Sequence, residues 1–237
     1  MIGDAFSYIF TSSNWSGSVG MLVELEQQLL LTVTALALAM LVGLPIALVL
    51  GHLGRGGFLA INVSNIGRAV PTFAVLILLS VGPLGTGVLG PYGRAGLATL
   101  VSLTLFALPP IITNSYVGMR EVDRNTVEAA TGMGMKGSQL FASVELPLAM
   151  PLVLTGLRLA LVQVWATATI AALVAGPGLG NVITAGFQNS DYGKGLAGAI
   201  VVAAVALVLE GTAALVERFA NPLARAERRE AATVAVA

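Results

Sequence analysis

The stretch REVDRNTVEAATGMGMKGSQLFASVELP, residues 120–147, differs in character from the rest of the chain. It contains seven of the 24 Lys, Arg, Asp and Glu residues, and a long apolar run lies on each side of it. The flanking runs are apolar enough to sit in lipid, whereas this segment is polar enough to face water. It therefore predicts a water-exposed loop between two membrane spans.

The first half of the loop predicts a short helix. Asp123 suits the N-cap position, because its carboxylate can accept a hydrogen bond from a free backbone N–H. Residues 126–131 are compatible with a helix. Gly132 and Gly134 are expected to end it, because glycine adopts the left-handed conformation without a Cβ clash.

The second half predicts another short helix, over residues 136–144. Pro147 is expected to end that helix and to let a membrane span begin. Together the two halves predict a helix–turn–helix that is joined to a span at each end and is well placed for a soluble partner to bind. A plain cytoplasmic loop without a partner is the alternative.

The composition places most of the chain in lipid. Of its 237 residues, 56% are hydrophobic and only 10% are charged, whereas soluble domains average about 25% charged residues. The absence of cysteine excludes disulfides and thiolate metal sites, and His52, the single histidine, excludes a histidine metal cluster. A net charge of zero argues against a nucleic-acid partner.

Five apolar runs are long enough for helices that cross a hydrocarbon core, which takes about 20 residues. Runs rich in Leu and Ala favour helices, because a helix satisfies its own backbone groups in lipid. Pro71 lies near the start of the second run, and Pro109 and Pro110 are expected to interrupt the third. The sequence thus predicts an all-α integral membrane protein whose spans are residues 29–50, 69–88, 97–117, 148–175 and 196–216.

Lys and Arg in the short loops predict the orientation, because they are enriched on the cytoplasmic side. An extracytoplasmic N-terminal segment, residues 1–28, and five spans within residues 29–219 leave a cytoplasmic tail, residues 220–237. Two basic residues then lie outside, Arg94 and Lys194. Nine lie inside: Arg55, Arg68, Arg120, Arg124, Lys136, Arg218, Arg225, Arg228 and Arg229.

Two glycine patterns match parts of nucleotide-binding motifs but lack their context. The string Gly132-x-Gly134-x-x-Gly137 follows no predicted strand, so it is not a dinucleotide fingerprint. Gly193-Lys194 lacks the earlier glycine and the following Ser or Thr of a phosphate-binding loop. The chain is therefore not expected to bind ATP or to be an enzyme, and it offers no catalytic, metal or cofactor residues.

Two ionisable residues lie within predicted spans, Arg158 in the fourth and Glu210 in the fifth. Charges inside a membrane are costly and often functional. We expect these two residues either to face the inner interface or to pair with each other.

A second candidate site follows the fourth span, where residues 175–181 read AGPGLGN. This density of Gly and Pro predicts a tight non-helical turn, which is either a simple exit from the membrane or an extracytoplasmic element near a gate. The small residues just before it permit close helix contact at a path or a subunit interface. The candidate gate or path residues are Pro71, Thr167, Thr169, Gly178 and Gly180.

The spacing within the polar loop resembles the EAA motif of the membrane subunits of ABC importers. Glu128-Ala-Ala is followed after three residues by Gly134 and, after nine more, by Val144-x-Leu-Pro, with Val in place of the usual Ile. Over about residues 28–219 the chain resembles the permease subunits of osmoprotectant importers. The strings that carry this are RAVPTFA (68–74), NSYVG (114–118), EAATGMGM (128–135), VELPLA (144–149), TAT (167–169) and GPGLG (176–180).

This resemblance implies a five-span permease of the type I importer class, similar to methionine permeases, in the inner or plasma membrane. The loop is then the cytoplasmic coupling helix, which enters a groove on an ATPase subunit that binds the ATP. The implied partners are an ATPase dimer, a second permease chain, identical or related, an extracytoplasmic substrate-binding protein and the lipid bilayer. The implied docking residues are Glu128, Ala129, Ala130, Gly132, Gly134, Leu146 and Pro147.

The implied cargo is a compatible solute such as glycine betaine, choline, carnitine or proline. A quaternary ammonium is usually held by an aromatic cage. Only 6% of the residues are aromatic and they do not cluster, so selectivity is expected mainly in the binding protein. A permease for methionine or another amino acid is the alternative, followed by an autonomous secondary carrier or channel.

The charge bias yields a topology prediction. Reporter fusions after Gly90 and after Asn189 should report an extracytoplasmic location, and a fusion after Lys136 should report a cytoplasmic one, because basic residues stay on the cytoplasmic side. Paired periplasmic and cytoplasmic reporters measure this. A cytoplasmic signal from the Gly90 fusion contradicts the five-span arrangement.

Overall fold

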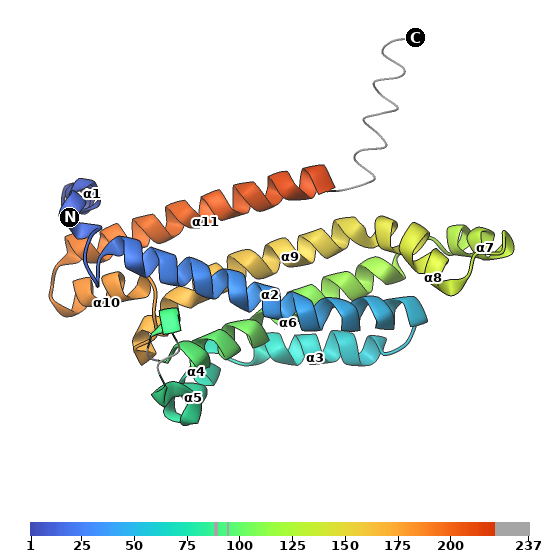
Figure 1. The fold of residues 1–237 in the computed structure, drawn as a ribbon, viewed down its shortest axis with the longest axis horizontal. Helices are drawn as coiled ribbons and strands as arrows, with labels where there is room; N and C mark the ends of the chain where they lie inside the picture. The colour runs from blue at the N-terminus through green and yellow to red at the C-terminus, as the bar shows by residue number, and fades with distance from the viewer. Residues whose placement is uncertain (88–89, 94, 221–237) are drawn as a thin grey trace, which may run out of the picture. The chain divides into compact units, whose positions relative to one another are not determined.

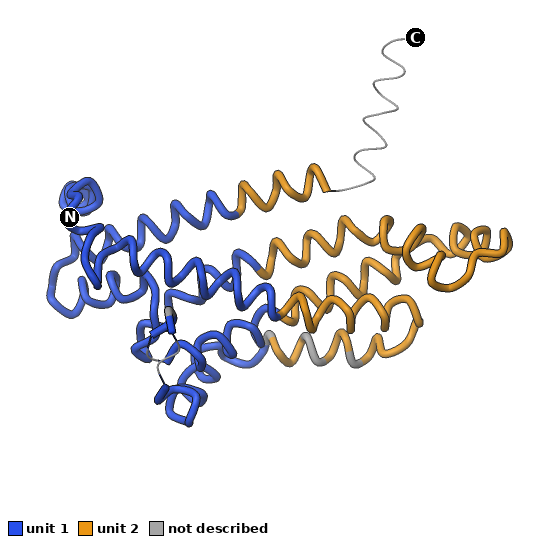
Figure 2. Tube along the Cα trace, in the orientation of Figure 1, with its two compact units in different colours: residues 1–38, 68–107, 161–209 blue, residues 39–67, 108–160, 210–237 orange. Residues whose placement is uncertain are grey.

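The computed structural model describes residues 1–87, 90–93 and 95–220, and every regular element in these ranges is a helix. The chain divides into two compact units, which Figure 2 distinguishes by colour. Unit 1 comprises residues 1–38, 68–107 and 161–209, and unit 2 comprises residues 39–67, 108–160 and 210–237.

Long helices alternate with short ones along the chain (Figure 1). η1, η2 and η4 are 3-10 helices, and η3 is a π-helix. In order, the elements are α1 (Ile2–Phe10), η1 (Ser12–Asn14), α2 (Met21–Leu53), α3 (Gly57–Ala69), α4 (Thr72–Val81), α5 (Pro83–Thr86), η2 (Gly90–Tyr92), α6 (Gly96–Arg120), α7 (Arg124–Gly132), α8 (Gly137–Leu140), η3 (Phe141–Glu145), α9 (Leu146–Ala168), η4 (Thr169–Val174), α10 (Gly180–Gln188) and α11 (Tyr192–Ala220).

Among the described residues, four stretches are long and apolar enough to cross a membrane: α2, α6, Gly137–Val174 and α11. α3 and α4 add a fifth if they are counted as one broken span. The expected all-α, multi-span architecture is confirmed. α2 begins at Met21, so it includes the end of the N-terminal segment predicted over residues 1–28. Apart from Ala220, the predicted tail at 220–237 lies outside the described residues.

The second predicted span, residues 69–88, is divided at a proline. α3 continues to Ala69, so Arg68 lies in its last turn rather than in a loop. Pro71 precedes the first residue of α4, with φ −63° and ψ 116°. The residue before a proline disfavours the helical conformation, and the chain is accordingly non-helical between α3 and α4. The end of this predicted span falls on residues 88 and 89, outside the described part.

The interruption that was expected at Pro109 and Pro110 is wrong, because α6 is continuous through both residues. In water a proline inside a helix costs about 3 kcal/mol. In hydrocarbon, unwinding the helix would cost more, since each exposed backbone group would lack any partner. The prolines also pack: a Cβ on Gly67 would lie 2.9 Å from Cγ of Pro109.

The core of unit 1 is built around Trp165 of α9, which is fully buried. Its indole Nε1 donates a hydrogen bond to the Val202 carbonyl of α11 at 3.0 Å. Tyr8 and Ile9 of α1 pack against the same core, so the N-terminal helix is part of this unit. The buried members of the core are Met21, Trp165, Leu179, Val182 and Val201.

In unit 2, α2 packs against α6 and α9. α2 approaches α6 closely at Gly51, where a Cβ would lie 2.5 Å from Cβ of Met119. Leu44 and Leu48, one turn apart on α2, pack against a core whose buried members include Ala149 of α9.

A close helix approach in unit 1 occurs between α10 and α11. A Cβ on Gly186 would lie 2.3 Å from the backbone nitrogen of Gly195 and 2.5 Å from its Cα. Such contacts are with backbone atoms, which cannot move aside as the tip of a side chain can. Glycine at position 186 therefore fixes the spacing of these two helices.

Gly186→Ala should lower the thermal-aggregation midpoint of the detergent-purified protein, because overpacking costs about 1–3 kcal/mol or more. Gly211→Ala is the matched control, since Gly211 lies within α11 and a Cβ there meets no atom within 4 Å. It should leave the midpoint unchanged or raise it slightly, because alanine favours helix over glycine by about 1 kcal/mol. Equal midpoints for Gly186→Ala and the parent would show that the close approach is absent.

Candidate functional site

The first helix of the polar loop begins as the sequence predicts. Asp123 is the N-cap of α7, and its Oδ1 accepts a hydrogen bond from the Asn125 N–H at 3.3 Å. Oδ2 accepts another from the Thr126 hydroxyl at 3.2 Å. A carboxylate at this end also interacts favourably with the helix dipole. The cap thus fixes the start of α7 at Arg124, shortly after α6 ends at Arg120.

The turn after α7 is a Schellman motif with Gly134 in the left-handed position. The Met135 N–H donates to the Ala130 carbonyl at 3.2 Å, and the Gly134 N–H donates to the Thr131 carbonyl at 2.9 Å. Gly134 has φ +87°, which favours glycine, and no atom lies within 4 Å of a Cβ placed there. Gly132 is still helical, so only Gly134 of the two predicted glycines terminates α7.

The residues of the docking motif divide between surface and interior. Glu128 and Ala129 are exposed on α7, as are the two glycines, whereas Ala130 is buried. Leu146 and Pro147 are half-buried at the start of α9. The exposed part of the motif is therefore free to contact a partner, and the remainder attaches the loop to unit 2.

Pro147 does not end the second helix, contrary to the sequence prediction. The chain is helical without a break from α8 through η3 into α9. The Leu146 N–H donates to the Phe141 carbonyl, which is a π-type bond. In a regular α-helix the ring of Pro147 would clash with the Ser143 carbonyl. The π register just before the proline relieves that clash and lets the helix continue.

The charged residues within the spans pair, as one of the two sequence hypotheses proposed. Arg158 Nε of α9 donates to Glu210 Oε1 of α11 at 2.7 Å, and Nη2 contacts the same oxygen. Nη1 donates to Glu217 Oε2 at 3.0 Å. The sequence analysis did not single out Glu217. It lies seven residues after Glu210, hence on the same face of α11, and that spacing was the available signal.

The second candidate site is the turn between η4 and α10, and two side chains of α2 hold it. Glu24 Oε2 accepts a hydrogen bond from the Gly178 N–H at 3.0 Å, and Gln28 Oε1 accepts one from the Leu179 N–H at 2.9 Å. Gln28 Nε2 donates to the Trp165 carbonyl at 3.2 Å. Both α2 side chains are buried. The sequence analysis did not single out Glu24 and Gln28, although two polar residues four positions apart in an apolar helix were an available signal.

Two residues of this turn have positive φ. Ala175 has φ +57°, a left-handed conformation that disfavours residues other than glycine, and Gly178 has φ +118°. A Cβ on Gly178 would lie 3.1 Å from Gln28 Oε1. A strained conformation such as that of Ala175 persists where surrounding contacts over-determine it, and such conformations cluster at active sites, ligand clamps and switch regions.

Two other candidate gate residues, Thr169 and Gly180, lie beside this turn. A Cβ on Gly180 would lie 2.0 Å from the Thr169 carbonyl oxygen, so these two backbones touch. α4, which follows Pro71, packs against η4, which begins at Thr169. Thr167 donates its hydroxyl to the Gln163 carbonyl of its own helix at 2.7 Å. The structure thus gathers Thr169, Gly178 and Gly180, whereas the hydroxyl of Thr167 is engaged within α9.

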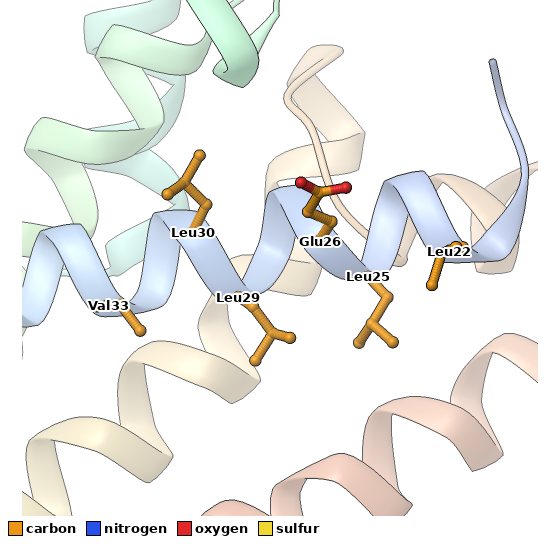
Figure 3. A pocket seen from close by; sticks show the side chains of 6 residues that line it. All are labelled: Leu22, Leu25, Glu26, Leu29, Leu30 and Val33. Atoms are coloured by element: carbon orange, nitrogen blue, oxygen red, sulfur yellow. The ribbon is translucent and has the colours of Figure 1, made fainter.

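A further hollow lies along α2 and involves neither site. It has a volume of about 480 Å³ and is apolar except for one carboxylate. Figure 3 shows its lining side chains, which all belong to α2: Leu22, Leu25, Glu26, Leu29, Leu30 and Val33. Within the described ranges, no group of three or more His, Asp or Glu side chains is placed to hold a metal ion.

The membrane helices and the capped polar loop define a multi-pass membrane protein with a polar loop between two spans. The family model described as binding-protein-dependent transport system inner membrane component matches residues 39–221. The chain belongs to this family and is a multi-pass inner-membrane protein. The resemblance inferred from the loop spacing is confirmed.

Two relatives illustrate the similarity. The carnitine transport permease protein OpuCB of Listeria monocytogenes is 33% identical over 210 residues, which cover 89% of this chain and 92% of that protein. The choline transport system permease protein OpuBB of Bacillus subtilis is 29% identical over 202 residues, which cover 85% and 89%. Like these relatives, the chain is a permease subunit rather than an enzyme.

A solved structure shares the fold. A chain of the inward-facing MetNI methionine ABC transporter superposes with a TM-score of 0.68 at 20% sequence identity, covering 84% of this chain and 94% of that one. At this identity the match defines the fold alone.

The conformation of Gly134 yields a prediction. Gly134→Val should misdirect α8 without disturbing the spans, because a side chain at positive φ costs about 1–2 kcal/mol or more and meets no neighbour. Membrane abundance should stay normal, whereas co-purification of the ATPase subunit and solute uptake should fall about 5–30-fold. Gly134→Asn should lose less, because asparagine tolerates the left-handed region.

Thr131→Ala is the control, since Thr131 is exposed, has no special backbone conformation, and its side-chain hydroxyl bonds to the Val127 carbonyl of its own helix. It should be nearly silent at matched membrane abundance. Parental uptake by Gly134→Val would mean that the 120–147 segment is an ordinary loop.

Proposed function

We propose that the chain forms the translocation path of an ATP-driven importer for a compatible solute such as carnitine, choline, glycine betaine or proline. The observation that carries this proposal is the 33% identity to a carnitine transport permease over 89% of the chain. The similarity extends over nearly the whole length of that relative, so it includes the spans as well as the loop.

The polar loop is the proposed docking element for the ATPase subunit. Glu128 and Ala129 are exposed on α7, and the turn at Gly134 holds α7 and α8 in a fixed relation. A small residue such as Ala129 lets a partner surface approach the helix backbone closely. ATP binds to the partner, and the chain itself holds no cofactor. A second permease, identical or related, and an extracytoplasmic binding protein complete the proposed assembly.

The proposed orientation has the N-terminus outside and the tail in the cytoplasm. Its support is the excess of nine basic residues over two beside the predicted spans and in the tail. In this orientation the 120–147 loop faces the cytoplasm, where an ATPase is available, and the turn at residues 175–179 faces the substrate-binding protein.

The turn at residues 175–179 is the proposed gate element. The turn contains Ala175 in a strained left-handed conformation, and Glu24 and Gln28 accept hydrogen bonds from its Gly178 and Leu179 N–H groups. Breaking these hydrogen bonds would free the turn to change conformation, which suits a segment that opens and closes. Pro71, Thr167 and Thr169 are proposed to line the gate or the path beside it.

A methionine or other amino-acid importer is less well supported. The solved amino-acid transporters share about the same fold but are only 20% identical, whereas the osmoprotectant permeases reach 33%. An autonomous carrier is disfavoured by the exposed docking motif, which such a carrier does not need.

Reconstitution tests the proposal. Proteoliposomes that contain the chain, its ATPase subunit and its binding protein should accumulate at least one of labelled carnitine, choline, glycine betaine and proline when ATP is supplied. Excess unlabelled solute should suppress the uptake, and the chain alone should not hydrolyse ATP. Uptake without ATP, or uptake of methionine and none of the four solutes, would contradict the proposal.

A further inference from the structure

The single histidine of the chain lies against the polar loop. His52 is next to the last residue of α2, and its Nδ1 contacts Oε2 of Glu145 in the π-helix η3. Glu145 is only 7% exposed, so its carboxylate is nearly removed from water. A buried carboxylate is stable only with a partner, and His52 is that partner.

The histidine ring makes a second contact to the same helical segment. Phe141 packs edge-on against His52, with ring centroids 5.4 Å apart and an interplanar angle of 77°. A Cβ on Gly137 would lie 3.8 Å from Nε2 of the histidine. Positions 137, 141 and 145 are four apart and so share one helix face. That face of α8 and η3 therefore packs against the His52 side chain of α2.

The pair also ends an apolar seam between α2 and α9. Leu44, Leu48 and His52 are spaced by four on α2, and the two leucines pack against the core that contains Ala149 and Val153 of α9. The seam is thus apolar along the helices and polar only at the loop. Unlike the leucine contacts, a hydrogen-bonded pair has a preferred direction and distance.

The connectivity explains why this contact matters. α6 leads into the loop through the chain and α9 leads out of it, so both follow any displacement of the loop directly. α2 has no such covalent link and must follow through side-chain contacts. At the cytoplasmic end of α2 in the proposed orientation, His52 supplies the polar and the aromatic contact at once.

We propose that His52 and Glu145 are positioning residues that transmit movement of the 120–147 loop to α2. The inference rests on the proposed function, in which the ATPase displaces this loop. When the loop moves, Glu145 moves with it, and its contact with His52 displaces the end of α2. Without the pair, the loop still docks and ATP is still hydrolysed, but α2 no longer follows.

The first test compares coupling in reconstituted complexes. The readout is solute taken up per ATP hydrolysed, which reduced folding alone does not change. Glu145→Ala should lower this ratio at least about fivefold, the lower end of typical coupling between sites. Glu145→Gln keeps an acceptor for His52 and should stay within about twofold of the parent, as mild substitutions do.

Two further variants separate coupling from stability. The double variant His52→Ala with Glu145→Ala leaves no unpaired buried carboxylate, so it should be more abundant than His52→Ala, which leaves Glu145 without its partner, yet its uptake per ATP should stay low. Glu26→Ala, which removes an exposed carboxylate from α2, should have the parental ratio. A parental ratio in the double variant would overturn the inference.

The second test does not require solute transport. The chain has no cysteine, so Leu53→Cys provides a single reactive thiol in the chain at the end of α2, at a position that is 56% exposed. In the assembled complex its alkylation rate should change on addition of ATP, and adding Glu145→Ala should abolish that change. An ATP response that persists with Glu145→Ala, or no response in the parent background, contradicts the inference.

The two tests distinguish the failure modes. Absent uptake of every solute with an ATP response at Leu53→Cys that depends on Glu145 would refute the proposed cargo and support the link. ATP-driven uptake with an unchanged ratio in Glu145→Ala would support the cargo and refute the link.

Discussion

A backbone group in hydrocarbon has no water to bond to, and this constraint determines most of the structure. It favours helices over irregular backbone and open sheet edges, because a helix pairs its own N–H and C=O groups. It also explains why α6 remains helical through Pro109 and Pro110 and why the helix that contains Pro147 changes register instead of ending. Losing one bond to a proline costs less than exposing a whole turn to lipid.

The same constraint makes polar residues informative wherever they occur in or beside a span. Arg158 is neutralised by Glu210 and Glu217, and Glu145 is paired with His52. The polar loop, by contrast, leaves Glu128 exposed and unneeded by the fold. The charges in or beside the spans are therefore paired within the chain, whereas the exposed motif is available to a partner.

Much of the loop could be predicted because its determinants are local. The cap at Asp123 and the left-handed turn at Gly134 follow from side-chain reach and backbone sterics, which the sequence specifies within a few residues. The family was likewise predictable, because the motif has several residue types at fixed separations.

The remainder depended on contacts between residues far apart in the sequence. Nothing within α2 alone shows that Glu24 and Gln28 bind the turn near Gly178, about 150 residues later in the chain, although their polarity in an apolar helix was visible. The prolines were misjudged because rules for helix termination come from water, where an opened turn can bond to solvent. In lipid that alternative is absent.

The central claim is that the 120–147 loop is the surface on which an ATPase docks. The cysteine-free chain permits a direct measurement: a photoreactive label on a single cysteine at Met133, which is 76% exposed beside the turn. The account predicts that light cross-links this position to the ATPase subunit in membranes, whereas a label at Val19, which is 81% exposed before α2, does not. Equal cross-linking from both positions, or none from Met133, would contradict it.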